Sequence, residues 1–158
     1  LVVEGITEFT GQTGGLPHVG TGCYRRVVSV PEDVAGKRIR IEFDGAMSHC
    51  QVYCNSEPVG EWPYGYTSFA FDLTNVIKPG QDNVIAVRLE NAKNSSRWYP
   101  GAGLYRNVRL IYLDPVHVAH WGTYLTTPTI TDDRGLVLLK TTLDNQFVIL
   151  FDIFLAKS

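Results

Sequence analysis

The densest group of side chains able to do chemistry lies in the run Arg97-Trp98-Tyr99-Pro100-Gly101-Ala102-Gly103. The Arg97 guanidinium can donate charge-assisted hydrogen bonds to hydroxyl groups. Trp98 and Tyr99 each offer a flat apolar face to a ligand. A second interpretation also holds: the proline and glycines shape a turn, and the two rings fill a contact between domains.

A second aromatic cluster is Trp62-Pro63-Tyr64-Gly65-Tyr66. Exposed rings of this kind can serve as a carbohydrate platform, because sugars stack on aromatic faces. Alternatively, the cluster is a loop that packs against another domain or a neighbouring subunit, and this is the interpretation that we favour. Left uncovered, such a surface would be an apolar patch that promotes association.

The remaining reactive side chains do not form a catalytic or metal-binding constellation. Glu42 lies on the polar face of an expected strand, and Glu57 and Glu61 flank a turn, so we interpret all three as solvated. The histidines are scattered along the chain and lack the spacing of a zinc site; they are His18, His49, His117 and His120. We therefore expect no catalytic residue, no metal and no cofactor in this chain.

The three cysteines, Cys23, Cys50 and Cys54, are interpreted as core or near-core thiols. Cys50 and Cys54 lie on one expected strand, roughly 13 Å apart at about 3.3 Å per residue, which is too far for a disulfide. The odd number of cysteines also argues against a disulfide scaffold.

The composition is that of an ordinary globular protein, with 44% hydrophobic and 19% charged residues and a formal net charge of -2. This balance gives no reason to expect a nucleic-acid or membrane-surface partner. No apolar run reaches the ~18 residues of a membrane span. No signal peptide is recognised, so we expect any export signal to lie upstream or to have been removed. The compartment stays unassigned, with the periplasm or the cell exterior favoured.

The elements that must position these residues are short strands. Ile39, Ile41 and Phe43 alternate with charged residues, which is typical of a half-buried antiparallel strand. Further strands are expected at 23–30, 51–54, 67–73, 84–89 and 105–113, separated by turn-forming residues. With no long amphipathic helix, the pattern predicts an all-β jelly roll or sandwich.

A domain boundary is expected at Asp114-Pro115. It separates a jelly-roll domain over residues 1–114 from residues 115–158, with strands at 116–119, 123–126 and 136–142. About 44 residues are too few for a typical immunoglobulin-like sandwich of ~100 residues, so the second unit is expected to be incomplete. The apolar tail after Asn145 is expected to be buried in a partner chain or to complete a sheet by swapping.

Several sequence segments, in order along the chain, resemble family 2 of the glycoside hydrolases. Their residues are most similar to those of bacterial β-galactosidases. They span residues 20–26, 43–46, 52–55, 59–60, 65–74, 82–91, 96–108, 115–118 and 122–123. The resemblance implies a galactose-binding-like jelly roll, the family's sugar-binding domain, followed by the start of an immunoglobulin-like domain. β-Glucuronidases and β-mannosidases share this architecture, so the resemblance specifies the family more closely than the sugar.

The resemblance also implies a division of labour. The family's retaining hydrolysis uses two glutamates on a TIM barrel, which needs ~250 residues, so this chain alone is expected to be inactive. Arg97, Trp98, Tyr99 and Asn91 are the candidate substrate-binding residues. The expected partners are a β-galactoside or related glycan and the catalytic barrel of the full-length chain, and a homo-oligomer is left open. The alternatives are a stand-alone carbohydrate-binding module and an assembly fragment that binds no sugar.

Overall fold

The protein is described by a computed structural model over residues 20–92 and 103–147. The chain divides into two compact units, with the division between Tyr112 and Leu113. The described elements are β1 (Gly20–Ser29), the short 3-10 helix η1 (Glu32–Val34), β2 (Arg38–Phe43), β3 (Cys50–Cys54), β4 (Glu57–Trp62), β5 (Phe69–Asp72), β6 (Asp82–Asn91), β7 (Val108–Leu113), β8 (Val116–Ile130) and β9 (Gly135–Asn145). Among the described residues, no helix has both the length and the apolar character needed to cross a membrane.

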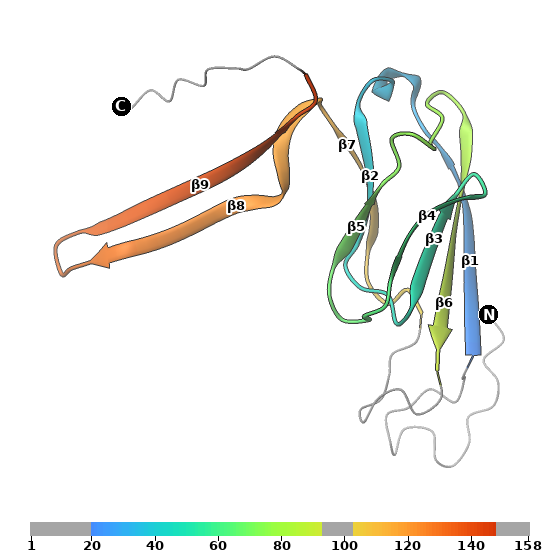
Figure 1. The fold of residues 1–158 in the computed structure, drawn as a ribbon, viewed down its shortest axis with the longest axis horizontal. Coiled ribbons are helices and arrows are strands. Elements are labelled where there is room, and N and C mark those ends of the chain that lie inside the picture. Colours follow the sequence, from blue (N-terminus) through green and yellow to red (C-terminus); the bar gives the residue numbers. More distant parts are fainter. Residues whose placement is uncertain (1–19, 93–102, 148–158) are drawn as a thin grey trace, which may run out of the picture. The chain divides into compact units, whose positions relative to one another are not determined.

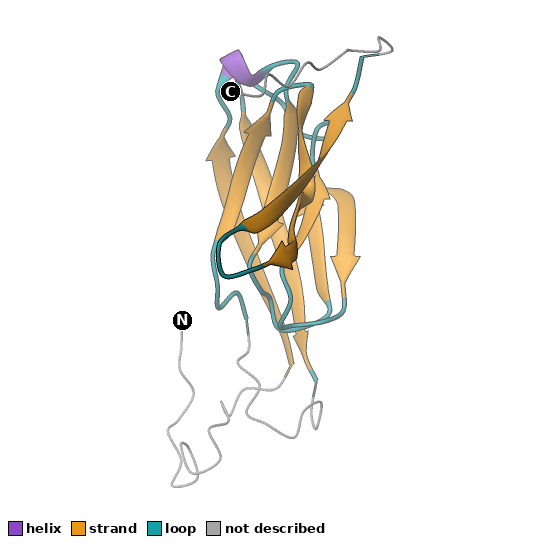
Figure 2. Ribbon diagram, turned by 90° about the vertical axis from the view of Figure 1, so that its left-hand side faces the viewer, coloured by secondary structure: helices purple, strands orange, loops and turns teal. Residues whose placement is uncertain are grey.

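The first unit is a two-layer β-sandwich (Figure 1). One sheet has the strand order β1-β6-β3-β4 and the other has the order β5-β2-β7. The pairs β1–β6, β3–β6, β3–β4 and β2–β5 are antiparallel. Strands account for most of the described residues, with one helical turn at one end (Figure 2). The all-β sandwich predicted from the sequence is thus confirmed.

Period-two alternation builds the core of this sandwich. Ile39, Ile41 and Phe43 are 2%, 2% and 0% exposed, so the predicted inward face of β2 is confirmed. Cys50, Val52 and Cys54 provide the matching face of β3 and are also buried. The core therefore lies between strands of opposite sheets, as expected for a face-to-face sandwich.

A buried asparagine holds the turn that precedes β6. Asn83 is fully buried, and its side-chain Oδ1 accepts hydrogen bonds from the Lys78 amide and from Asn55 Nδ2, both at 2.8 Å. Its Nδ2 donates to the Lys78 carbonyl at 2.9 Å. Because the polar atoms of Asn83 are satisfied within the turn, its burial carries no desolvation penalty from a missing partner.

The second unit is a β-hairpin formed by β8 and β9. The expected strands at 116–119 and 123–126 are one strand with an irregularity between Val118 and Thr123, where Trp121 has a φ of 53°. Every residue of β9 is exposed. The assignment of this unit to an incomplete immunoglobulin-like domain stays a prediction, and the apolar tail lies largely outside the described residues.

Candidate functional site

Three of the four candidate substrate-binding residues, Arg97, Trp98 and Tyr99, lie outside the described residues. Asn91 is described as the last residue of β6. It is only 7% exposed and is in register with Gly20 on the neighbouring strand β1. The structure therefore places Asn91 at the point where the connection to Gly103 begins.

The far end of that connection is held by Met47, in the loop between β2 and β3. The Met47 amide donates to the Gly103 carbonyl at 3.1 Å, and the Gly103 amide donates to the Met47 carbonyl at 3.0 Å. Gly103 has a φ of +99°, a conformation that favours glycine. A Cβ at this position would also lie on top of the Tyr24 hydroxyl. That hydroxyl in turn accepts a hydrogen bond from the Leu104 amide at 3.4 Å.

The near end of the connection is held by Ser48, the next residue in the same loop. The Glu90 amide donates to the Ser48 carbonyl at 2.8 Å, and Ser48 Oγ donates to the Glu90 carbonyl at 2.8 Å. Neither Met47 nor Ser48 is recognisable from the sequence as holding this connection. Their residue types carry no signal for this role, because three of the four hydrogen bonds join main-chain groups and all four join segments far apart in the chain.

An arginine pair organises the start of the same loop. Arg109 Nη1 lies 2.7 Å from Asp44 Oδ1, and Arg106 Nη1 donates to the Asp44 carbonyl at 3.2 Å. The hydrogen bond from Arg109 lowers the pKa of Asp44 below its ordinary value. The same contact raises the pKa of Arg109. Asp44 is therefore held as a carboxylate that fixes the loop, and it is not poised to donate a proton at neutral pH.

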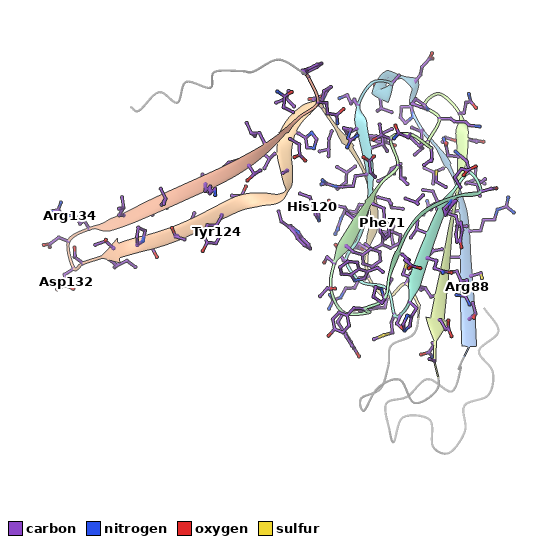
Figure 3. The ribbon with its side chains drawn as sticks, in the orientation of Figure 1. Phe71, Arg88, His120, Tyr124, Asp132 and Arg134 are labelled. Atoms are coloured by element: carbon purple, nitrogen blue, oxygen red, sulfur yellow. The ribbon has the colours of Figure 1, made fainter. Side chains whose placement is uncertain are left out.

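A small polar recess of about 230 Å³ lies near the end of β6. Arg88, whose side chain is labelled in Figure 3, crosses this surface: it donates to Gln51 Oε1 at 3.3 Å and lies 3.7 Å from Glu90 Oε2. The recess is lined by His49, Cys50, Gln51, Glu61, Trp62, Pro63, Arg88 and Glu90. Its charges are partly matched within the protein, and it adjoins the residue before Asn91.

A larger groove of about 660 Å³ lies between the two edge strands β1 and β7. Its floor is apolar, with Val28, Ile41 and Leu110 among the lining residues, and three arginines, Arg25, Arg26 and Arg109, also line it. This composition suits packing of an apolar segment better than recognition of a polyhydroxylated ligand.

The aromatic cluster at 62–66 is split by the fold. Trp62 stacks on Phe69 at a centroid distance of 5.6 Å, and its indole Nε1 donates to Thr67 Oγ1 at 3.2 Å, so it belongs to the sandwich. Tyr64 and Tyr66 are 55% and 44% exposed and contact each other edge to face. Only these two rings of the cluster are open to a ligand or a partner.

Among the potentially reactive side chains, Glu42 takes part in an ion pair and two of the three cysteines are buried in the core. Glu42 is ion-paired with Arg40 at 2.7 Å and half-buried, so the interpretation as a solvated side chain is wrong for this residue. Cys50 and Cys54 are fully buried, and burial raises the pKa of the Cys50 thiol to about 12. Cys23 is exposed, contrary to the expected burial, because β1 is an edge strand. Among the described residues, no three His, Cys, Asp or Glu side chains gather closely enough to hold a metal ion.

Comparison with known proteins gives consistent matches over most of the chain. The profile of the sugar binding domain of glycosyl hydrolases family 2 matches residues 15–115. The β-galactosidase BoGH2A of Bacteroides ovatus is 46% identical over 138 residues, covering 87% of this chain and 16% of that protein. A β-glucuronidase of Formosa agariphila is 31% identical, covering 80% of this chain and 15% of its own length.

Solved structures agree with these matches. A family 2 glycosyl hydrolase from Bacteroides cellulosilyticus superposes with a TM-score of 0.78 at 37% identity, over 83% of this chain and 17% of that one. A β-glycosidase from Bacteroides vulgatus gives a TM-score of 0.79 at 29% identity, over 85% of this chain and 18% of that one. The chain thus spans about a sixth of these relatives, in the region of their sugar-binding domain. With its sandwich and its sequence both matched, the chain belongs to glycoside hydrolase family 2.

Proposed function

We propose that this chain is the sugar-binding and scaffolding portion of a β-galactosidase-type glycoside hydrolase. The observation that carries the proposal is the match of residues 15–115 to the family's sugar-binding domain, together with 46% identity to a β-galactosidase. In this proposal the complete enzyme hydrolyses the O-glycosyl bond of a β-galactoside or related glycan. The present chain supplies one wall of the sugar site and a rigid body on which other domains pack.

Hydrolysis is assigned to a catalytic barrel elsewhere in the complete enzyme. A retaining glycosidase needs two carboxyl groups ~5–5.5 Å apart, one acting as nucleophile and the other as acid and base. Several described carboxylates are instead bonded to arginines: Glu42 to Arg40, Asp44 to Arg109 at 2.7 Å, and Asp72 to Arg38 at 2.7 Å. For Asp44 the hydrogen bond from Arg109 lowers the pKa, which works against a role as general acid.

The sugar contacts are assigned to the connection that leaves Asn91 and returns at Gly103. Arg97 would donate hydrogen bonds to sugar hydroxyls, and Trp98 or Tyr99 would lie against the apolar face of the ring. Asn91 would contribute its amide from the end of β6. Support comes from the hydrogen bonds at both ends of this connection, Ser48 with Glu90 and Met47 with Gly103, since binding loses less entropy when the groups involved are held in place beforehand.

A stand-alone carbohydrate-binding module is the second candidate. The exposed Tyr64 and Tyr66 rings favour it, because they are open to stacking on a sugar without any other domain. The two candidates thus place the sugar on different residues of the same chain.

The experiment that separates them is calorimetric titration of methyl β-galactoside into the 158-residue chain and into the complete enzyme. The proposed function predicts that Arg97→Ala weakens binding to the complete enzyme by about tenfold, the loss expected for a charge-assisted hydrogen bond. Tyr64→Ala should leave that binding unchanged. Millimolar binding by the isolated chain that is lost in Tyr64→Ala would instead select the stand-alone module.

A further inference from the structure

The polar recess near the end of β6 is built on a row of three side chains from neighbouring strands. Gln51 on β3 is in register with Arg88 on β6 and with Glu61 on β4. Cys50 and Val52, on either side of Gln51, are buried in the core, so Gln51 lies on the opposite, outer face of the sheet. Residues directly opposite on antiparallel strands have Cβ atoms about 4.5–5.5 Å apart, so the three side chains lie next to one another on that face.

Arg88, labelled in Figure 3, is held across the recess by three long contacts. Its Nη1 donates to Gln51 Oε1 at 3.3 Å and lies 3.7 Å from Glu90 Oε2, and its Nη2 donates to Thr21 Oγ1 at 3.3 Å. All three distances exceed the ~2.7–3.2 Å of ordinary N–H···O hydrogen bonds. A guanidinium also has more N–H donors than these contacts use. Arg88 can therefore donate to a ligand without first breaking a short ion pair.

Glu61 and His49 add polar groups that other residues leave unbonded. Both line the recess and both are exposed, and within residues 20–92 and 103–147 neither side chain has a hydrogen bond or an ion pair. The His49 backbone has a φ of 44°, in the left-handed region that is uncommon for a residue other than glycine, and its amide is held by the Pro63 carbonyl at 3.2 Å. Residues held in this region gather at binding and active sites.

The lining of the recess defines the class of ligand that it fits. It carries one guanidinium against two carboxylates, Glu61 and Glu90, so an anionic ligand such as a phosphate or a uronate meets net repulsion. The carboxylates accept hydrogen bonds, whereas Arg88 and Gln51 donate them, a combination that suits neighbouring hydroxyl groups. The Pro63 ring adds apolar surface, and the volume of about 230 Å³ restricts the ligand to a small one. These properties together fit one neutral sugar ring.

We propose that this recess binds a neutral monosaccharide unit of a glycan, with the sugar hydroxyls bonded to Arg88, Gln51 and Glu61. The inference goes beyond the proposed function, because these residues belong to β3, β4 and β6 and not to the connection between Asn91 and Gly103. One sugar ring of about a dozen non-hydrogen atoms is expected to bind with a Kd on the order of 1 mM. In the complete enzyme, such a site would keep a glycan chain attached to the protein.

The test is a titration of the 158-residue chain with methyl β-galactoside, followed through the amide chemical shifts of the isotope-labelled protein. The shifts should change at residues 49–51 and 61. Glu61→Ala should weaken binding at least about fivefold, because the carboxylate accepts charge-assisted hydrogen bonds from the sugar. Glu57→Ala is the matched control and should leave binding unchanged: both glutamates are exposed residues of the edge strand β4, but Glu57 does not line the recess.

A second sugar tests the charge of the recess. Methyl β-glucuronide should bind about fivefold more weakly than the galactoside at neutral pH, and Glu61→Gln, which keeps the shape and removes the charge, should narrow this difference. Equal affinities for the two sugars in the unsubstituted chain would overturn the proposal. So would unchanged shifts at residues 49–51 and 61 with sugar at about ten times the expected Kd, or equal effects of Glu61→Ala and Glu57→Ala.

The failure of this proposal and the failure of the proposed function give different results. In the 158-residue chain, Arg97→Ala and Tyr64→Ala should both leave binding in the recess unchanged. Binding that is lost in either variant would place the sugar outside the recess and overturn the inference. The proposed function is tested instead by Arg97→Ala in the complete enzyme, and its outcome there does not depend on Glu61.

Discussion

The sandwich and the hairpin contain the same kinds of apolar residues, but these residues are buried in the sandwich and exposed to solvent in the hairpin. In the sandwich, Phe43 and Leu73 are fully buried. In the hairpin, Leu136 and Leu139 are each 58% exposed, and the Tyr124 side chain, labelled in Figure 3, is 67% exposed. Strands of both units alternate their side chains between two faces, so the difference does not come from local structure.

The difference lies in how many layers each unit has. The two sheets of the sandwich cover each other, whereas the described part of the second unit is one hairpin, and two strands alone are marginally stable in water. The register places Leu125 opposite Leu139 and Val118 opposite Leu143, which gathers apolar side chains on one face. We infer that the sandwich supplies its own stability, and that the hairpin needs further strands to bury this face.

The strongest way to break this comparison is to truncate one apolar residue in each unit. Phe43→Ala removes a fully buried ring that stacks on Phe69 at 4.8 Å, and it should lower the free energy of unfolding by about 3–5 kcal/mol. Leu139→Ala should change it by no more than about 0.5 kcal/mol, because that side chain is largely solvated already. Denaturant unfolding followed by circular dichroism measures both. Equal losses would show that Leu139 is buried in solution.

A second pair of variants adds a methyl group to each unit. A Cβ on Gly60 would lie about 2.5 Å from the Phe71 ring, so Gly60→Ala should cost about 1–3 kcal/mol through overpacking. Gly135, at the start of β9, has nothing within 4 Å of its Cβ position, so Gly135→Ala should be neutral or stabilising by up to about 1 kcal/mol. The two melting temperatures report the difference. A destabilising Gly135→Ala would argue that the hairpin is covered by other parts of the protein.

The smallest expected effect concerns charge. Arg109 holds the pKa of Asp44 below its ordinary value, so the ionised carboxylate stabilises the sandwich at neutral pH. This contribution to stability is fully present at pH values above the pKa that Asp44 has in the unfolded chain. It is lost as the pH falls through the lower pKa that Asp44 has in the folded protein. Asp44→Asn should therefore reduce the melting temperature at pH 7, and this reduction should shrink as the pH falls through the lowered pKa of Asp44 in the folded protein.

The control for this prediction is Asp144→Asn in the hairpin, where Asp144 lies 3.7 Å from His117 and its side chain is 57% exposed. It should shift the melting temperature less than Asp44→Asn does at pH 7. A pH-independent effect of Asp44→Asn would show that the carboxylate acts through its shape and not through its charge.

Much of the fold follows from local pattern, and the errors have identifiable causes. The alternating residues of β2 and the strand expected at 84–89, which is part of β6, are as predicted, because period two acts over a few residues. Strand β4 is not among the expected strands, and Glu57 and Glu61, expected to flank a turn, both lie on it. The fold tolerates Pro58 within this strand because β4 is an edge strand. Cys23 was wrongly expected to be buried, since a sequence does not show which strand lies at an edge.

The sequence by itself therefore determined most of the strand pattern, the family and the residues proposed to bind sugar, because each depends on residue types over short spans. Only the tertiary structure brought Met47 to Gly103, Ser48 to Glu90 and Tyr24 to Leu104. Those contacts join segments up to 80 positions apart, largely through main-chain amides and carbonyls. Nearly every residue carries a main-chain amide and a carbonyl, so residue types do not indicate which of these groups pair. The pairing is set only by how the sheets pack.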